Sequence, residues 1–405
     1  MIQVDEMEKK TMDRKAFIIL SFIMFLTMTG YGIVLPSLPY VAERLGLSSF
    51  QMGSLITGWA LAQFISTPVW GRLIDRFGRK PILFIGLFGF GIAFILIIFA
   101  QTYGQLLVAR IIGATLSAGS LPAALTIVAD SSDDENRGNA MAKIGAVNGL
   151  GFLCGPALGG IFAPLGVNAP FIAAGSLAFL ALPFVWVSIK EPPKQKLKMA
   201  EPSFIRSLIL VTKTGYRELY ILTLGISLAA SSLFGMLGYF MIDRFSATPG
   251  EVSLAFSIFA GGSAFVQFFL LKYLYQIRTE NWIAKFGFVI CAIGYLLIAA
   301  SIDIWMVVLG CALVGVGSAC IRPTIISLLS KQERMGRGIT MGLDQAIDSF
   351  GRILGPLMGG VFYAVHITVP FVGSSLICAL LFFAVWINGR NSYGVWRMEK
   401  EINGK

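Results

Sequence analysis

Long apolar segments recur along the whole chain and constrain its fold more than any other feature. A helix needs about 20 mostly apolar residues to cross the hydrocarbon core of a bilayer. We count twelve such segments, at residues 16–38, 50–71, 81–101, 104–129, 139–163, 169–189, 219–241, 252–273, 283–302, 304–330, 338–363 and 368–388. A membrane β-barrel would instead show alternating strands of about ten residues. The sequence therefore predicts an all-α polytopic membrane protein with twelve transmembrane helices.

The charges are few and unevenly placed. Of the 405 residues, 56% are hydrophobic and only 13% are charged, whereas soluble domains carry about 25% charged residues. The net charge of +10 comes from basic residues in alternate connections, and the other connections hold only Arg44 and Arg244. This bias marks the cytoplasmic side, so we expect a multi-pass protein of the cell (plasma or inner) membrane with both termini in the cytoplasm. The basic excess is a topology signal and gives no reason to expect a nucleic-acid partner.

The second half of the chain repeats the first at an offset near 200 residues. The stretch Arg137–Phe171 aligns without gaps on Arg337–Phe371, and both copies contain the pattern Gly-x-x-x-Gly-Pro-x-x-Gly-Gly. We expect two pseudo-symmetric six-helix bundles at residues 1–189 and 219–405, joined by a basic cytoplasmic linker at 190–218. Such repeats imply a two-fold axis along the membrane normal, with a binding site between the halves near the midplane.

A polar motif follows the second segment. It consists of two glycines, an aspartate and three basic residues: Gly71, Asp75, Arg76, Gly78, Arg79 and Lys80. The glycines allow tight turns and close helix approach, and Asp75 is well placed to accept hydrogen bonds from the N-terminus of a neighbouring helix. A merely positive cytoplasmic loop would account for the basic residues, but not for the glycines and the aspartate at this spacing.

A second motif lies in the fifth segment. It combines four small residues with a proline: Gly151, Gly155, Pro156, Gly159 and Gly160. Small residues four apart permit close backbone approach to another helix, and a proline bends the helix that contains it. The motif is either a pivot or seal between helices or ordinary small-residue packing, and duplication alone explains its repeat at 351–360.

These motifs resemble those of a known family. The stretch 71–80 is similar to the signature loop of the major facilitator superfamily. The stretch Gly30–Pro39, the residues Arg110 and Gly113, and the fifth-segment motif resemble the twelve-helix drug:proton antiporters of that superfamily, which include bacterial multidrug and tetracycline-type exporters. The resemblance implies the major facilitator fold and export of amphipathic small molecules by proton antiport with alternating access. It also implies a proton gradient as the energy source, with no cofactor and no metal, and a monomer in the lipid bilayer.

Charged residues inside a membrane are costly, so each is a functional candidate. Apart from the lysines at the cytoplasmic ends, which belong to the basic connections, five lie within the predicted segments: Arg110, Arg322, Asp344, Asp348 and Arg352. Asp344, Asp348 and Arg352 are four residues apart in series, which places them along one stripe of the eleventh helix. From the helical rise, Asp344 and Asp348 lie about 9 Å and about 15 Å from the cytoplasmic end, and Arg322 lies at a similar depth.

Two interpretations of this cluster remain open. The arginines can neutralise the aspartates and only hold the helices together, or one aspartate can exchange a proton during transport. Burial raises a carboxyl pKa and a nearby arginine lowers it, so a moving arginine could switch the protonation state. Asp348 is the first candidate because it lies nearest the midplane. Many related antiporters carry an acidic residue in helix one, four or seven, but this chain has none within those helices.

Substrate recognition needs groups that line the predicted cavity. Aromatic and amide side chains in the helices that line such cavities are candidates: Tyr31, Gln63, Phe234, Tyr239 and Gln267. Three buried arginines against two aspartates leave one excess positive charge, which suits an anionic substrate. An exporter of a specific metabolite or sugar is therefore the alternative to a drug exporter. The sequence contains no H-E-x-x-H or phosphate loop, so we do not expect an enzyme.

Overall fold

The computed structural model describes residues 14–131, 134–189, 191, 217–331 and 337–388, and these residues form helices and short connections without strands. The first half contains α1 (Arg14–Arg44), α2 (Ser49–Phe77), α3 (Arg79–Phe99), α4 (Tyr103–Ser117), α5 (Ser120–Asp130), α6 (Asp134–Phe162), the 3-10 turn η1 (Ala163–Leu165) and α7 (Ala169–Ser188). The second half contains α9 (Arg217–Phe245), α10 (Pro249–Phe265), the π-helical η2 (Val266–Leu270), α11 (Leu271–Ile277), α12 (Glu280–Ala299), α13 (Ile304–Ser330), α14 (Arg337–Val365) and α15 (Val369–Asn388).

The prediction of an all-α membrane fold with twelve spans is confirmed. The segments α4 and α5 together form one passage, as do α10, η2 and α11, so the described residues contain twelve helical passages. Ten of them are long and apolar enough to cross a membrane. The other two, α2 and α14, pack against each other. Both carry charged residues and pack between the halves, which explains their lower hydropathy.

Equivalent residues start the second helix of each half. Ser48 accepts a hydrogen bond from the backbone N–H of Gln51, whose side chain accepts one from Ser48 in return. Thr248 and Glu251 form the same reciprocal pair before α10. This capping box satisfies N–H groups that the first helical turn leaves without partners, and its recurrence near an offset of 200 residues follows from the repeat in the sequence.

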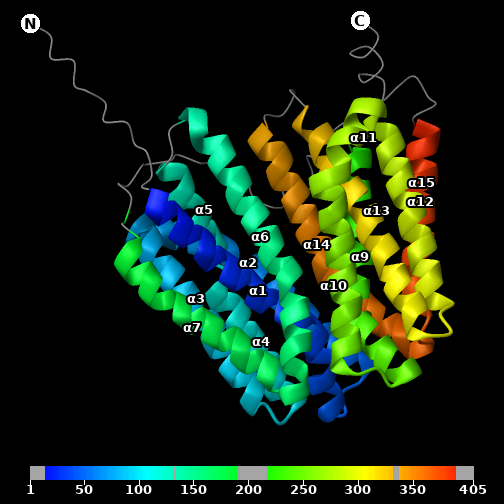
Figure 1. The fold of residues 1–405 in the computed structure, drawn as a ribbon, viewed down its shortest axis with the longest axis horizontal. Coiled ribbons are helices and arrows are strands. Elements are labelled where there is room, and N and C mark those ends of the chain that lie inside the picture. Colours follow the sequence, from blue (N-terminus) through cyan, green and yellow to red (C-terminus); the bar gives the residue numbers. More distant parts are fainter. Residues whose placement is uncertain (1–13, 132–133, 190, 192–216, 332–336, 389–405) are drawn as a thin grey trace, which may run out of the picture.

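The helices form two groups, α1–α7 and α9–α15, that diverge toward one end of the molecule and converge toward the other (Figure 1). We call the first the basic end, because the α2–α3 turn with Arg79 and Lys80 lies there. The halves meet at the opposite end, where α2 contacts α14 and α6 contacts α10. Of the predicted linker 190–218, only residues 191, 217 and 218 belong to the described part of the chain.

The glycine motif packs in the same way in both halves. A Cβ added at Gly155 would lie 2.5 Å from the Cα of Gly32 in α1, and one added at Gly355 would lie 2.7 Å from the carbonyl oxygen of Leu228 in α9. The last glycine of each copy touches the other half: Gly160 faces Ser253 of α10, and Gly360 faces Ser49 of α2. Each copy therefore joins two helices of its own half and contributes one contact between the halves.

We expect Gly155→Ala to destabilise the protein by about 1–3 kcal/mol, because the added methyl group must push α1 and α6 apart. Gly149→Ala on the same helix is the matched control, since a Cβ there meets nothing within 4 Å. The control should be neutral or stabilising, because alanine favours a helix over glycine. Thermal unfolding of the purified protein measures both, and equal unfolding temperatures would contradict the close packing.

Candidate functional site

Asp344 is buried in α14 and bound by two neighbouring helices. Its carboxylate accepts a hydrogen bond of 2.6 Å from the Thr223 hydroxyl of α9 and one of 3.3 Å from the Arg322 Nη1 of α13. The second Arg322 nitrogen lies 3.2 Å from the other carboxylate oxygen. Every oxygen of this carboxylate thus has a partner, as a buried charge requires.

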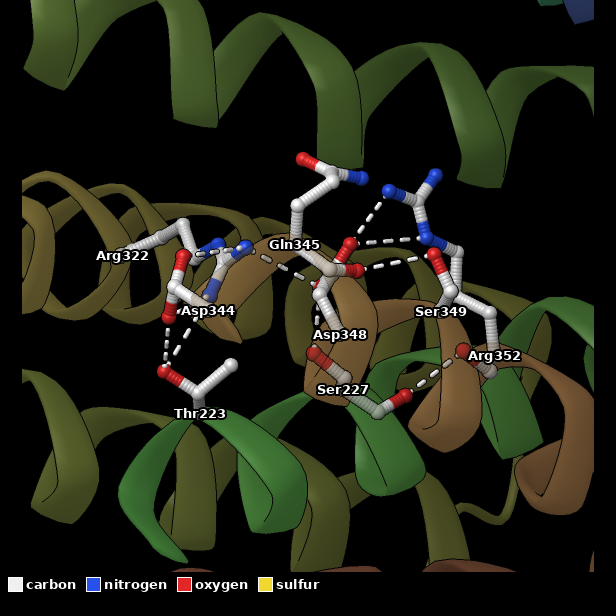
Figure 2. A network of polar contacts seen from close by, with 9 residues as sticks. Thr223, Ser227, Arg322, Asp344, Gln345, Asp348, Ser349 and Arg352 are labelled. Carbon is white, nitrogen blue, oxygen red and sulfur yellow. Dashed lines mark hydrogen bonds and ion pairs between the residues drawn. The ribbon is translucent and has the colours of Figure 1, made fainter. Parts of the chain in front are cut away.

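Asp348, one turn further along α14, has three partners (Figure 2). One carboxylate oxygen accepts a hydrogen bond of 2.5 Å from the Ser227 hydroxyl and lies 3.3 Å from the Arg322 Nη2. The other oxygen accepts a hydrogen bond of 2.9 Å from the Arg352 Nε and a second bond from the Arg352 Nη2. Arg322 therefore bridges the two aspartates, and Arg352 binds Asp348 from the far side.

The arginines are the accessible members of this charged network. The side chains of Asp344 and Asp348 are 5% and 10% exposed, whereas that of Arg352 is 56% exposed. Arg352 lies one helical turn before Pro356, which packs beside Gly53 of the other half. The exposed Arg352 is therefore close, along α14, to the contact between the halves. Figure 2 shows its guanidinium group and the Gln345 amide extending to the same side.

The hydroxyl groups in this network were not predicted from the sequence. Thr223 and Ser227 are four residues apart on α9, which matches the spacing of Asp344 and Asp348 on α14. This equal spacing is the signal that would have identified the two hydroxyl residues. Using that signal requires knowing that α9 and α14 are neighbours.

Arg110 does not belong to the network. It lies in α4, is 5% exposed, and places its guanidinium carbon 4.4 Å from the centroid of the Trp59 ring. Within the described residues it forms no ion pair, so a cation–π contact holds this charge in the N-terminal half. The predicted buried charges thus fall into two separate sites.

The aromatic candidates Tyr31 and Phe234 belong to a chain of ring contacts that joins the N-terminal and C-terminal halves. Tyr31 is half-buried and contacts the rings of Trp59 and Phe152 at 6.0 Å and 6.3 Å between centroids. Phe152 in turn contacts Phe234 of α9 at 6.4 Å. Gln63 and Gln267 are exposed. These rings form a continuous apolar contact between the halves.

Tyr239 lies elsewhere and does not line the space between the halves. It is 7% exposed, and its hydroxyl donates a hydrogen bond of 2.8 Å to the Leu47 carbonyl at the opposite end of the molecule. Its ring packs against Tyr363. In this conformation Tyr239 is part of the contact that joins the halves, and its place in a substrate pocket stays a prediction.

The motif at 71–80 forms a second charged site at the basic end. Gly78 has a φ of +104°, which only glycine adopts without strain, and it links α2 to α3. The Arg79 guanidinium lies 2.7 Å from the Asp130 carboxylate at the end of α5, and both side chains are buried. The Lys80 ammonium donates a hydrogen bond of 2.6 Å to the Trp186 carbonyl.

The acid at the N-terminus of α3 is Glu191, and the contact predicted for Asp75 with a neighbouring helix stays a prediction. The Glu191 carboxylate accepts hydrogen bonds of 2.6 Å and 2.8 Å from the backbone N–H groups of Arg79 and Lys80. Asp75 is exposed. A Cβ at Gly71 would meet nothing within 4 Å, and Arg76 stacks on Phe77 with 5.2 Å to the ring centroid. The buried contacts of the motif described above are those of Gly78 and Arg79.

Twelve helical passages in two similar halves, with charges buried inside each half, are typical of a membrane transporter. The sequence matches the model of the Major Facilitator Superfamily over residues 20–237 and 219–400. The protein therefore belongs to this superfamily, and it is a transporter rather than an enzyme.

Similar proteins include bacterial resistance proteins. The quinolone resistance protein NorA of Staphylococcus aureus (strain COL) is 29% identical over 378 residues, which cover 89% of this chain and 94% of NorA. Multidrug resistance protein 2 of Bacillus subtilis (strain 168) is 26% identical over 394 residues, which cover 95% of this chain and 98% of that protein.

Solved structures of other transporters share the fold. The nucleoside transporter NupG superposes with a TM-score of 0.76 at 14% identity, covering 93% of this chain and 99% of NupG. A bacterial homologue of the human lysosomal transporter Spinster, in an inward-facing and occupied conformation, gives a TM-score of 0.76 at 15% identity, covering 92% and 96%.

We expect Arg79→Met to cost about 3–5 kcal/mol of stability, because it leaves the buried Asp130 carboxylate without its cation. The double variant Arg79→Met with Asp130→Leu should recover most of this loss, since it removes both charges. Arg72→Met, at an exposed position of α2, should change stability by less than about 0.5 kcal/mol. Thermal unfolding of the three variants in detergent is the measurement, and a double variant no more stable than Arg79→Met would contradict the pairing.

Proposed function

We propose that this protein exports amphipathic small molecules from the cell in exchange for protons. Asp348 carries the proposal, because it is a buried carboxylate bound by two arginines, and its partner Arg352 is exposed one helical turn from the contact between the halves. The resistance proteins that resemble the chain support export of drug-like compounds. The proton gradient supplies the energy, and no cofactor is required.

The charge distribution supports an orientation in which the basic end faces the cytoplasm. Both chain termini then lie in the cytoplasm. The halves are apart at that end and joined at the other (Figure 1), as expected of a transporter that is open to the cytoplasm. Rocking of one half against the other would carry the substrate site to the outer side.

The chemistry of Asp348 supports its role in coupling. In its ionised form the carboxylate binds the guanidinium groups of Arg322 and Arg352. A proton on Asp348 removes that attraction and leaves Arg352 without its charged partner. Conformations that separate Arg352 from Asp348 then become accessible. The aromatic rings of Tyr31, Phe152 and Phe234 offer an apolar surface for the substrate, and the amides of Gln63 and Gln267 offer hydrogen bonds.

We expect Asp348→Asn to abolish uphill, proton-driven efflux in proteoliposomes while leaving downhill movement of substrate measurable, because the asparagine cannot exchange a proton. Asp303→Asn is the control, since Asp303 caps α13 through the Met306 N–H and asparagine caps equally well. The assay imposes a proton gradient and follows both the compound and the internal pH. Gradient-driven efflux by Asp348→Asn at the wild-type rate would exclude Asp348 as the coupling group.

Export of an anionic metabolite is the second candidate, and one observation favours it. Both aspartates are fully paired, whereas Arg352 is 56% exposed and Arg110 has no acidic partner among the described residues. The interior thus holds more positive than negative charge, which suits a carboxylate or phosphate on the substrate.

The pH dependence of substrate binding distinguishes the two candidates. A cationic drug competes with the proton for Asp348, and linkage is reciprocal, so its affinity should rise as the pH rises. An anion that takes Arg352 from Asp348 favours protonation of Asp348, so its affinity should rise as the pH falls. We expect the first result, measured as dissociation constants of matched cationic and anionic compounds over a pH series. Tighter binding of the anions at lower pH would replace the drug proposal by the metabolite proposal.

A further inference from the structure

We propose that Thr57 is a positioning residue for the transport cycle: its hydroxyl holds the outer gate closed and releases it when Asp348 takes up a proton. This inference rests on the proposed function of Asp348. The Thr57 hydroxyl of α2 donates a hydrogen bond of 2.7 Å to the carbonyl oxygen of Ile353 in α14. Ile353 directly follows Arg352, the residue that binds Asp348. The contact between the halves and the proton site are thus adjacent on one helix.

The rest of the α2–α14 contact forms a gate around this bond. The Ser49 hydroxyl donates a hydrogen bond of 3.0 Å to the Gly360 carbonyl, two turns beyond Ile353. Between these bonds Gly53 packs directly on the carbonyl group of Pro356. Two hydroxyl groups of one half therefore bind backbone carbonyls of the other, and the glycine between them allows the two backbones to approach.

Pro356 provides a bending point between the proton site and the gate. A proline has no N–H, so it cannot donate the usual helical hydrogen bond to the carbonyl of the residue four positions earlier, here Arg352. The helix is thus weakest at the turn that joins Arg352 to Pro356. A displacement of Arg352 at this turn moves the Ile353 carbonyl, and with it the acceptor of the Thr57 bond.

The coupling follows from these contacts. While Asp348 is ionised, its bonds to Arg352 fix the turn 348–352 and present the Ile353 carbonyl to Thr57. A proton on Asp348 ends this restraint, the turn shifts at Pro356, and the Thr57 bond is lost. By reciprocity, breaking the Thr57 bond makes protonation of Asp348 more favourable.

Other ionisable groups near Asp348 are few within the described residues. On α14 they are Asp344 and Arg352, and α13 contributes Arg322. On α9 the phenol of Tyr220 lies near Asp344. The described part of α15 has no charged residue, and Arg72, the first charged residue of α2, is about 22 Å along the helix from Thr57.

Spin labels at the outer ends of the two halves measure the gate directly. Leu165→Cys and Ile302→Cys are suitable sites, because these side chains are 76% and 80% exposed. Cys154→Ser removes the half-buried cysteine, and the other four cysteines are buried. Pulsed electron paramagnetic resonance over a pH series gives the ratio of outer-open to outer-closed molecules.

Three substitutions on α2 test the hydroxyl group. Thr57→Val keeps the shape of the side chain but removes the donor, and it should raise the outer-open ratio at high pH about fivefold, the factor that one ordinary hydrogen bond supplies. Thr57→Ser retains the hydroxyl and should behave as the wild type. Thr67→Val is the matched control, because the Thr67 hydroxyl bonds only to the Gln63 carbonyl of its own helix. An unchanged ratio in Thr57→Val would overturn the proposal.

A double variant tests the coupling to Asp348. Asp348→Asn mimics the protonated state and should raise the outer-open ratio by itself. If the bond is released through Asp348, adding Thr57→Val to Asp348→Asn should change the ratio by less than about twofold, since coupled sites are not additive. If the double variant changes the outer-open ratio by the product of the two single-variant factors, the coupling is overturned. A ratio that depends neither on pH nor on Asp348→Asn, with Thr57→Val still effective, would instead refute the proton role of Asp348.

Discussion

The bridge that Arg322 makes between Asp344 and Asp348 determines how the C-terminal half is assembled. Two carboxylates four residues apart on one buried helix face repel each other and are costly to ionise. Arg322 lies within 3.3 Å of an oxygen of each, which fixes the depth of α13 against α14. Thr223 and Ser227 each donate a hydrogen bond to one of these carboxylates and fix α9 in the same register. Three helices are thus aligned around the two carboxylates of α14.

Each half also contains an ion pair at the equivalent place, but the acid and the base are exchanged between the two halves. Arg79 at the start of α3 binds Asp130 at the end of α5, whereas Glu280 at the start of α12 binds Lys331 after α13, at 2.6 Å. A helix N-terminus favours an anion and a C-terminus a cation, so only the second pair agrees with the helix dipoles. The N-terminal pair places charges of the wrong sign at both ends. The Glu191 carboxylate offsets this at α3 by binding its first N–H groups.

The fold and the buried charges were predictable from the sequence because both depend on local composition. An apolar segment with a stripe of charges, such as 338–363, identifies a helix and one of its faces without knowledge of its neighbours. Partners distant in the chain were not predictable. Asp130 pairs with the Arg79 side chain, and Glu191 accepts a hydrogen bond from the Arg79 backbone. Tyr239 donates a hydrogen bond to the Leu47 carbonyl. No periodicity in the sequence reveals contacts over such separations. The acid at the N-terminus of α3 is also distant in the chain, because Glu191 lies 112 residues from Arg79.

Duplication has supplied two equivalent seals, but only one of them adjoins a charged site. Gly160 and Gly360 each contact the other half at the end opposite the basic end. In α14 the residues 344, 348 and 352 that precede the seal are charged, whereas their counterparts in α6 are Ile144, Asn148 and Phe152. In the proposed function, a proton on Asp348 would change the electrostatics beside the α2–α14 contact and leave the α6–α10 contact unaffected. We propose that the α6–α10 contact is then the pivot, so that movement is controlled from one side of the symmetric scaffold.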